Sequence, residues 1–110
     1  MIGALSLTLD ATFFALSDPK RRSILERLGR GPATLSQLAA PSGLTLNGIK
    51  SHVRILELAG LVQTKKVGRA RECRLGSAMK LDEAGEWIDA HRRAWEGRLD
   101  RFESFVEGGG

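Results

Sequence analysis

The chain has little of what disulfide-bonded or membrane proteins require. It contains one cysteine, Cys73, among 110 residues, and a single thiol cannot form an internal disulfide or a cysteine-rich metal site. No apolar run approaches the roughly 20 residues that span a bilayer. Residues 1–9 lack the basic start of a secretory signal peptide, and no small-residue cleavage site follows a long apolar run. We therefore expect a cytoplasmic protein without membrane association, whose fold depends on packing.

Catalytic signatures are also missing from the sequence. Ser, His and Asp are present, but neither a nucleophile elbow nor a phosphate-binding glycine loop accompanies them. The glycines of Gly29-Arg30-Gly31 are placed to break a helix rather than to cradle phosphate. No internal repeat occurs. The sequence predicts a single non-enzymatic domain over residues 1–107, followed by a flexible glycine tail at 108–110.

Charge is distributed unevenly along the chain. The formal net charge is +4, yet residues 19–74 hold 12 Lys/Arg and 3 Asp/Glu, a net charge of +9. Residues 1–18 have a net charge of −2, and residues 75–110 of −3. A basic block between acidic ends favours a polyanionic partner, because neutralised phosphates release counterions. A well-solvated surface can carry the same charges, so a second line of evidence is needed.

Capping signals delimit four helices in the first 60 residues. Asp18 can accept backbone N–H bonds as an N-cap, and Pro19 suits the first helical position. Thr34 and Gln37 form a capping-box pattern, and Thr45 can cap the next helix. The predicted helices cover residues 8–16, 19–28, 35–40 and 46–59.

Beyond Gly60 the apolar period changes from that of a helix to that of a strand. Residues 61–66 and 70–75 read as two strands, and the glycine-centred connection at 67–69 predicts a hairpin. Such a hairpin is unstable alone and has to lie against the helices. Cys73 falls on its inward face, where it is more often a core residue than a sensor.

A long helix is predicted from about Met79 to Glu107. Its apolar seam spans about 39 Å, which exceeds the core that a chain of this length builds around one helix. We therefore expect a homodimer through the two terminal helices, and the alternative is a core helix of a monomer. The seam consists of Leu81, Ala84, Ile88, His91, Trp95, Leu99, Phe102 and Val106. The residues expected in the dimer interface are Leu9, Phe13, Ile88, His91, Trp95, Leu99, Phe102 and Val106.

The order of the elements (helix, short helix, glycine turn, longer helix, basic hairpin) is typical of a winged helix-turn-helix. In that arrangement the first short helix braces the second, which enters the major groove of double-stranded DNA. The 46–59 helix has the required two faces, with Ile49, Val53 (or His52) and Leu56 on one side. On the other side lie side chains that can bond base edges or phosphates. These candidate reading residues are Thr45, Asn47, Lys50, Ser51 and Arg54.

Four cations cluster at or near the tip of the hairpin. A basic β-ribbon can follow the phosphate backbone or place an arginine in the minor groove. The same charges can also protect an exposed strand edge, and both interpretations can hold together. The candidate backbone-binding residues are Lys65, Lys66, Arg69 and Arg71.

Several stretches resemble the ArsR-type winged-helix repressors, in the branch without recognised metal ligands. The likeness covers about residues 11–107 and implies a homodimer, an inverted-repeat operator and repression that a signal relieves. It also implies a mainly helical α+β fold, with about five helices and a two-stranded hairpin wing. Two positions depart from the family pattern: Lys50, often a small hydroxyl residue, and Leu46, where polar residues are common. The matching stretches are 14–25 (FALSDPKRRSIL), 38–39, 52–56, 59–62, 68–69 and 87–95.

The resemblance raises the question of metal ligands. We expect neither a metal site nor a cofactor in this chain. The thiolate sensors of this family carry cysteines where this chain has Leu35-Ser36-Gln37-Leu38. The terminal-helix sensors need a second ligand pair after Asp89-Ala90-His91, but Phe102 and Phe105 occupy those positions. His91 is instead expected in the helix seam, and His52 is expected to pack or to bond to backbone. The alternative function is a winged-helix module for protein–protein or non-specific nucleic-acid binding.

Overall fold

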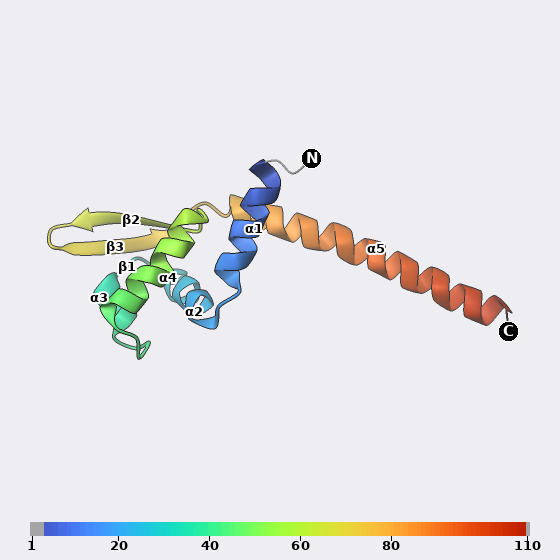
Figure 1. The fold of residues 1–110 in the computed structure, drawn as a ribbon, viewed down its shortest axis with the longest axis horizontal. Helices are drawn as coiled ribbons and strands as arrows, with labels where there is room; N and C mark the ends of the chain where they lie inside the picture. Colours follow the sequence, from blue (N-terminus) through green and yellow to red (C-terminus); the bar gives the residue numbers. More distant parts are fainter. Residues whose placement is uncertain (1–3, 110) are drawn as a thin grey trace.

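The computed structural model describes the backbone of residues 4–109 and the side chains of residues 8–103. Over this range the chain forms five helices and three strands, and the wing strands follow the helix-turn-helix (Figure 1). The elements are α1 (Ala4–Leu16), α2 (Pro19–Leu28), β1 (Ala33–Thr34), α3 (Leu35–Ala39), α4 (Leu46–Leu58), β2 (Val62–Val67), β3 (Ala70–Leu75) and α5 (Met79–Gly109).

The predicted caps are confirmed. The Asp18 carboxylate accepts from the backbone amides of Lys20 and Arg21, and Pro19 opens α2. Thr34 Oγ1 accepts from the Gln37 amide at 3.2 Å, while Gln37 Oε1 accepts from the Thr34 amide at 2.9 Å, which completes the capping box before α3. The first backbone amides of a helix have no carbonyl partner within the helix. The caps supply acceptors for these amides and fix the residue at which each helix begins.

The core lies where α4 crosses α1, α2 and the sheet. Ile49 and Leu56 of α4 have no exposed surface, and Val53 between them is also buried, as the spacing predicted. Other buried residues come from each neighbouring element. They include Ala15, Ile24, Leu28, Leu35, Leu38, Leu61, Val62 and Cys73.

The sheet has three strands within residues 4–109, not the predicted two. The short β1 pairs antiparallel with β3, in register Ala33 with Cys73, so the order is β1-β3-β2. A two-residue strand shows no alternation that a sequence pattern can reveal. The hairpin is also tighter than expected, because Val67 pairs with Ala70 and leaves a two-residue turn at Gly68 and Arg69. Gly68 has φ +61°, a left-handed conformation that glycine adopts without strain.

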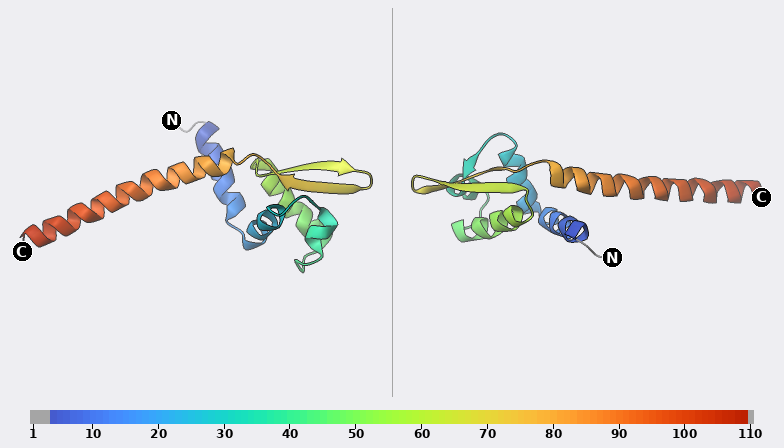
Figure 2. Two further views of the ribbon diagram at one scale, coloured as in Figure 1. Left: turned by 180° about the vertical axis from the view of Figure 1, so that it is seen from behind. Right: turned by 90° about the horizontal axis from the view of Figure 1, so that it is seen from above.

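The last helix projects far from the rest of the molecule. The protein measures 70 × 32 × 21 Å, with the hairpin and the C-terminal end of α5 at opposite ends of the long axis (Figure 1). Views from behind and from above show no other element beside the C-terminal half of α5 (Figure 2). The helix continues to Gly109, two residues past the expected end at Glu107.

Candidate nucleic-acid interface

The outward face of α4 is mainly polar, with the exposed Leu46 at its start. All five candidate reading residues are exposed, and they lie opposite the buried stripe of Ile49, Val53 and Leu56. Thr45 is the N-cap of α4, and its Oγ1 accepts from the Gly48 amide at 3.1 Å. Ser51 Oγ donates to the Asn47 carbonyl at 3.2 Å. Thr45 is thus the predicted N-cap, and its hydroxyl, with one lone pair engaged, can still donate outward.

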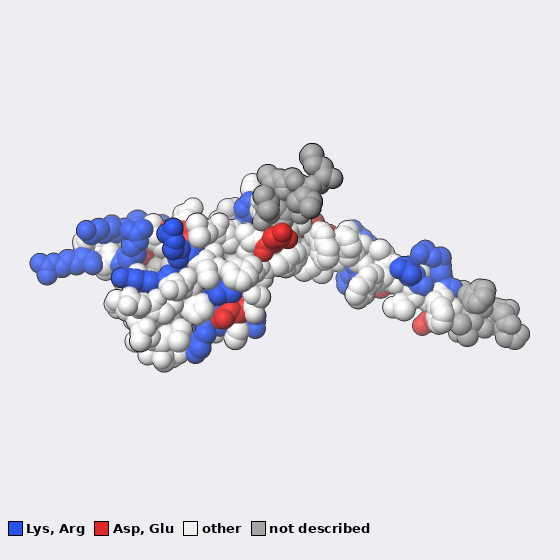
Figure 3. All heavy atoms as spheres, in the orientation of Figure 1, with Lys and Arg blue, Asp and Glu red and all other residues white. Residues whose placement is uncertain are grey.

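The four wing cations are exposed but do not form one cluster. Successive residues of a strand point to opposite faces, and the register pairs Lys66 with Arg71 and Lys65 with Glu72. Lys66 and Arg71 share the face of Thr64 and Cys73, which is turned toward α4. Lys65 lies on the opposite face, across from a carboxylate, and Arg69 lies in the turn. Figure 3 shows the basic side chains gathered over the hairpin, at the end of the molecule away from α5.

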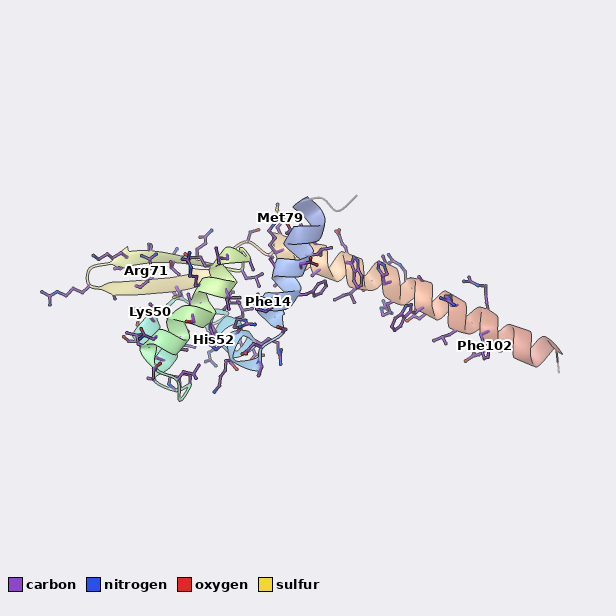
Figure 4. All side chains as sticks on the ribbon, viewed as in Figure 1. Phe14, Lys50, His52, Arg71, Met79 and Phe102 are labelled. Carbon is purple, nitrogen blue, oxygen red and sulfur yellow. The ribbon has the colours of Figure 1, made fainter. Side chains whose placement is uncertain are left out.

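A cleft of about 310 Å³ separates the recognition helix from the hairpin. Three cations line it, Lys50 and Arg54 from α4 and Arg71 from β3. Figure 4 shows Lys50 and Arg71 on the hairpin side of α4. A cleft with cations on both walls attracts phosphate, so the structure joins part of the reading face and part of the wing into one surface.

A hydrogen bond across the base of this cleft ties the wing to the recognition helix. Thr64 Oγ1 of β2 donates to Glu57 Oε2 of α4 at 2.7 Å. Glu57 is half-buried, and its negative charge lies on the inner side of a surface that is otherwise basic. Sequence reasoning missed this pair, because seven residues and a change of secondary structure separate its members.

The thiol of Cys73 is placed for packing. Its side chain is fully buried in the core beneath the cleft. Burial raises the pKa of the Cys73 thiol, the negative charges of Glu57 and Glu72 raise it further, and Arg71 opposes them. A buried thiol with a raised pKa stays protonated and unreactive.

Histidine 52 differs from its expected role. It neither bonds to backbone nor merely packs; its Nδ1 lies 3.2 Å from Nη1 of Arg21. Arg21 in turn is buried, although it belongs to the basic block that the sequence assigned to a polyanionic partner. One of the cations in that block is therefore unavailable to DNA.

The residues expected at a dimer interface divide into two groups. Leu9 and Phe13 are half-buried, and the Phe13 ring packs edge-on against Trp87 of α5, with centroids 5.9 Å apart. His91 stacks on Trp87 at 4.0 Å. The remaining described residues are exposed on α5: Ile88, Trp95, Leu99 and Phe102. Val106 lies outside the described side chains.

The described residues contain neither a metal-binding cluster nor a helix that could span a membrane. No three His, Cys, Asp or Glu side chains among them come together as a group able to hold a metal ion. None of the helices that the structure describes combines the length and apolar character needed to cross a membrane.

Known proteins share this sequence and architecture. A model for a helix-turn-helix domain matches residues 16–64. The HTH-type transcriptional regulator Rv2034 of Mycobacterium tuberculosis is 33% identical over 85 residues, which cover 74% of this chain and 79% of that protein. The crystal structure of an ArsR family transcriptional regulator, RHA00566, is 38% identical with a TM-score of 0.75, and the match covers 81% of this chain and 91% of that one. An ArsR-like transcriptional regulator from Rhodococcus sp. RHA1 is 30% identical with a TM-score of 0.80, over 93% of both chains.

The short helix α3, the capped helix α4 and the basic hairpin together define a winged helix-turn-helix, the fold of a DNA-binding transcriptional regulator. The regulators that it matches over most of their length specify the class further. The chain belongs to the ArsR family of transcriptional regulators.

Proposed function

We propose that the protein is a homodimeric repressor that recognises an inverted-repeat operator in double-stranded DNA. The observation that carries this proposal is the cationic cleft between α4 and the hairpin, beside a fully exposed polar helix face. A major groove admits one helix, whose outward side chains meet base edges while flanking cations hold the phosphates. In this proposal Asn47, Lys50, Ser51 and Arg54 read bases, with Thr45 at the groove edge.

The wing supplies contacts that position the protein without reading sequence. Arg71 lines the cleft, Lys66 lies beside it on the same face of the hairpin, and Arg69 occupies the turn, where it can reach the neighbouring backbone or minor groove. Lys65, on the other face, contributes to the general positive field. Contacts of this kind give affinity that falls steeply with salt.

The dimer follows from the exposed apolar residues of α5. Trp95, Leu99 and Phe102 are 72%, 60% and 64% exposed, and they lie one helical turn apart on one face. A second copy packed along this seam would cover them and generate a two-fold axis. Two-fold symmetry places two recognition helices about 34 Å apart, one turn of DNA, and calls for an inverted repeat. Repression then results when the bound dimer excludes polymerase from the same DNA.

The first test is selection of bound sequences from a random duplex pool, with the complex sized by light scattering. We expect an inverted repeat bound by a dimer. Recovery of no motif, with weak binding that salt abolishes, would favour a non-specific nucleic-acid or protein-interaction role instead.

Two matched variants then separate reading from positioning. Lys50→Ala should change the preferred base at one position of each half-site, because Lys50 lies on the reading face. Lys66→Ala removes the same charge from the wing and should weaken all sequences alike while reducing the salt slope by about 1. If both variants only lower affinity uniformly, the division between reading and positioning is wrong.

A further inference from the structure

One arginine of the basic block is a buried structural element. Arg21 is 6% exposed, and three of its side-chain nitrogens have partners. Nε donates to the Ala15 carbonyl at 2.8 Å, and Nη2 donates to the Phe14 carbonyl at 2.9 Å. The guanidinium carbon also lies 5.0 Å from the centre of the Phe14 ring. A buried cation persists only when its donors are satisfied in this way.

These contacts fasten α2 to the end of α1. The last carbonyls of a helix have no partner within it and carry a partial negative charge, so they favour a cation. Arg21 occupies two of them, and Arg22 donates to a third, the Leu16 carbonyl, at 2.7 Å. The C-terminus of α1 is thereby held by two neighbouring side chains of α2.

The remaining nitrogen of Arg21 reaches the recognition helix. Nη1 lies 3.2 Å from Nδ1 of His52, in the middle of α4. Because a guanidinium only donates, Nδ1 must be the acceptor, which requires the neutral imidazole with its proton on Nε2. Figure 4 shows His52 on the side of α4 toward Phe14, away from Lys50. The pair therefore contacts the recognition helix from behind, without access to DNA.

We propose that Arg21 and neutral His52 are positioning residues for DNA recognition, which fix the orientation of α4 to the C-terminal end of α1. Since α1 packs on α5, the pair connects the reading face to the two helices that form the proposed dimer interface. The orientation of each recognition helix relative to the two-fold axis then depends on this contact. The inference rests on the proposed function, because orientation matters only where two half-sites are read together.

The contact between Arg21 and His52 requires the neutral imidazole. On α4 itself, the residues three and four positions away are Gly48, Ile49, Ile55 and Leu56, all uncharged. From α1 come the carbonyls of Phe14 and Ala15, bonded to Arg21, and from α2 come the Arg21 guanidinium and the Asp18 carboxylate. The pKa of the Asp18 carboxyl is lowered: desolvation opposes the shift, but the hydrogen bonds from the Lys20 and Arg21 amides and the charge of Arg21 outweigh it. Protonation of His52 removes the acceptor and sets two cations side by side.

The test uses two substitutions of His52 in the full chain. His52→Asn keeps an acceptor oxygen near the position of Nδ1 but does not become cationic, whereas His52→Leu keeps similar volume without an acceptor. Affinities for the selected operator and for an unrelated duplex are measured at about pH 8 and about pH 5.5. Dimer mass and unfolding are recorded alongside.

We expect His52→Leu to lose roughly tenfold in operator affinity, as for a buried donor left without a partner, with unchanged affinity for the unrelated duplex. The wild type should lose operator affinity on acidification, and His52→Asn should keep it. The inference would be overturned if His52→Leu bound the operator as tightly as the wild type at pH 8. It would also be overturned if His52→Asn lost as much operator affinity on acidification as the wild type. If His52→Leu fails to fold, the comparison of the wild type with His52→Asn still tests the positioning role of the contact. A wild type that prefers no operator at pH 8 refutes the proposed function itself, and the positioning role falls with it.

Discussion

The helices α4 and α5 have opposite kinds of surface. In α4 the apolar stripe packs into the chain's own core, and the exposed face is mainly polar and cationic, with Leu46 at its start. In α5 the buried contact ends near Ala84 and the Phe13–Trp87 packing. Beyond that point the same kind of apolar stripe continues, but it is exposed.

Because of this difference, the exposed surfaces of the two helices suit different partners. An isolated polar face is stable in water, so α4 is complete as a folded element and its surface is free to meet a charged ligand. An exposed stripe containing Trp95, Leu99 and Phe102 is costly in water, so α5 requires an apolar partner. One helix is therefore suited to a polyanion and the other to a second copy of the chain.

Truncation inside α4 should have the largest effect. Leu56 has no exposed surface, so Leu56→Ala leaves a cavity and should lower the free energy of unfolding by about 2–5 kcal/mol. Urea unfolding monitored by circular dichroism measures this loss. Leu46→Ala is the control, with the same change in the same helix at a residue 43% exposed. Equal losses of unfolding free energy in the two variants would contradict the conclusion that the apolar stripe of α4 is buried in the core.

A charge on the α5 seam should act on association instead. Leu99→Asp places a carboxylate where the proposed partner covers an apolar side chain, and the dimer dissociation constant should rise by about a hundredfold or more. Sedimentation equilibrium over a range of concentrations measures it. Ala90→Asp adds the same charge at an exposed position on a different side of α5 and should leave the dimer intact. Operator affinity should fall with dissociation in the first variant only; a Leu99→Asp protein that remains dimeric would place the interface elsewhere.

The elements that sequence reasoning predicted well depend on neighbouring residues. Asp18 with Pro19, and Thr34 with Gln37, are spaced within one turn, so caps and helix starts can be read directly. The buried stripe of α4 follows from periodicity for the same reason. The predicted reading residues are all exposed on one face because that face is the complement of the stripe.

The features that were missed depend on contacts between distant segments. The strand β1 exists because Ala33 pairs with Cys73, forty residues later. Arg21 and His52 are 31 residues apart, and in the sequence Arg21 resembles the exposed cations beside it. The strand register was needed to place Lys65 opposite Glu72 and Lys66 opposite Arg71. Composition thus predicted the sign of the surface charge but not which cations contribute to that charge.

The smallest predicted effect concerns the apolar residue at the start of the recognition helix. Leu46 is 43% exposed and lies four residues before Lys50 and eight before Arg54, on the face that we assign to the groove. An apolar side chain there can contact the methyl group of thymine, next to the adenine that Asn47 can read. If Leu46 makes this contact, replacing one operator thymine per half-site with deoxyuridine should weaken binding by about fourfold, from roughly 0.8 kcal/mol per buried methyl. Leu46→Ala should abolish the difference between the two duplexes, while Leu56 and the rest of the core stay intact. Filter binding of matched thymine and uracil duplexes measures the ratio of the two affinities. If no such replacement weakens binding of the wild type, Leu46 makes no contact with a thymine methyl group, and α4 recognises DNA through polar side chains alone.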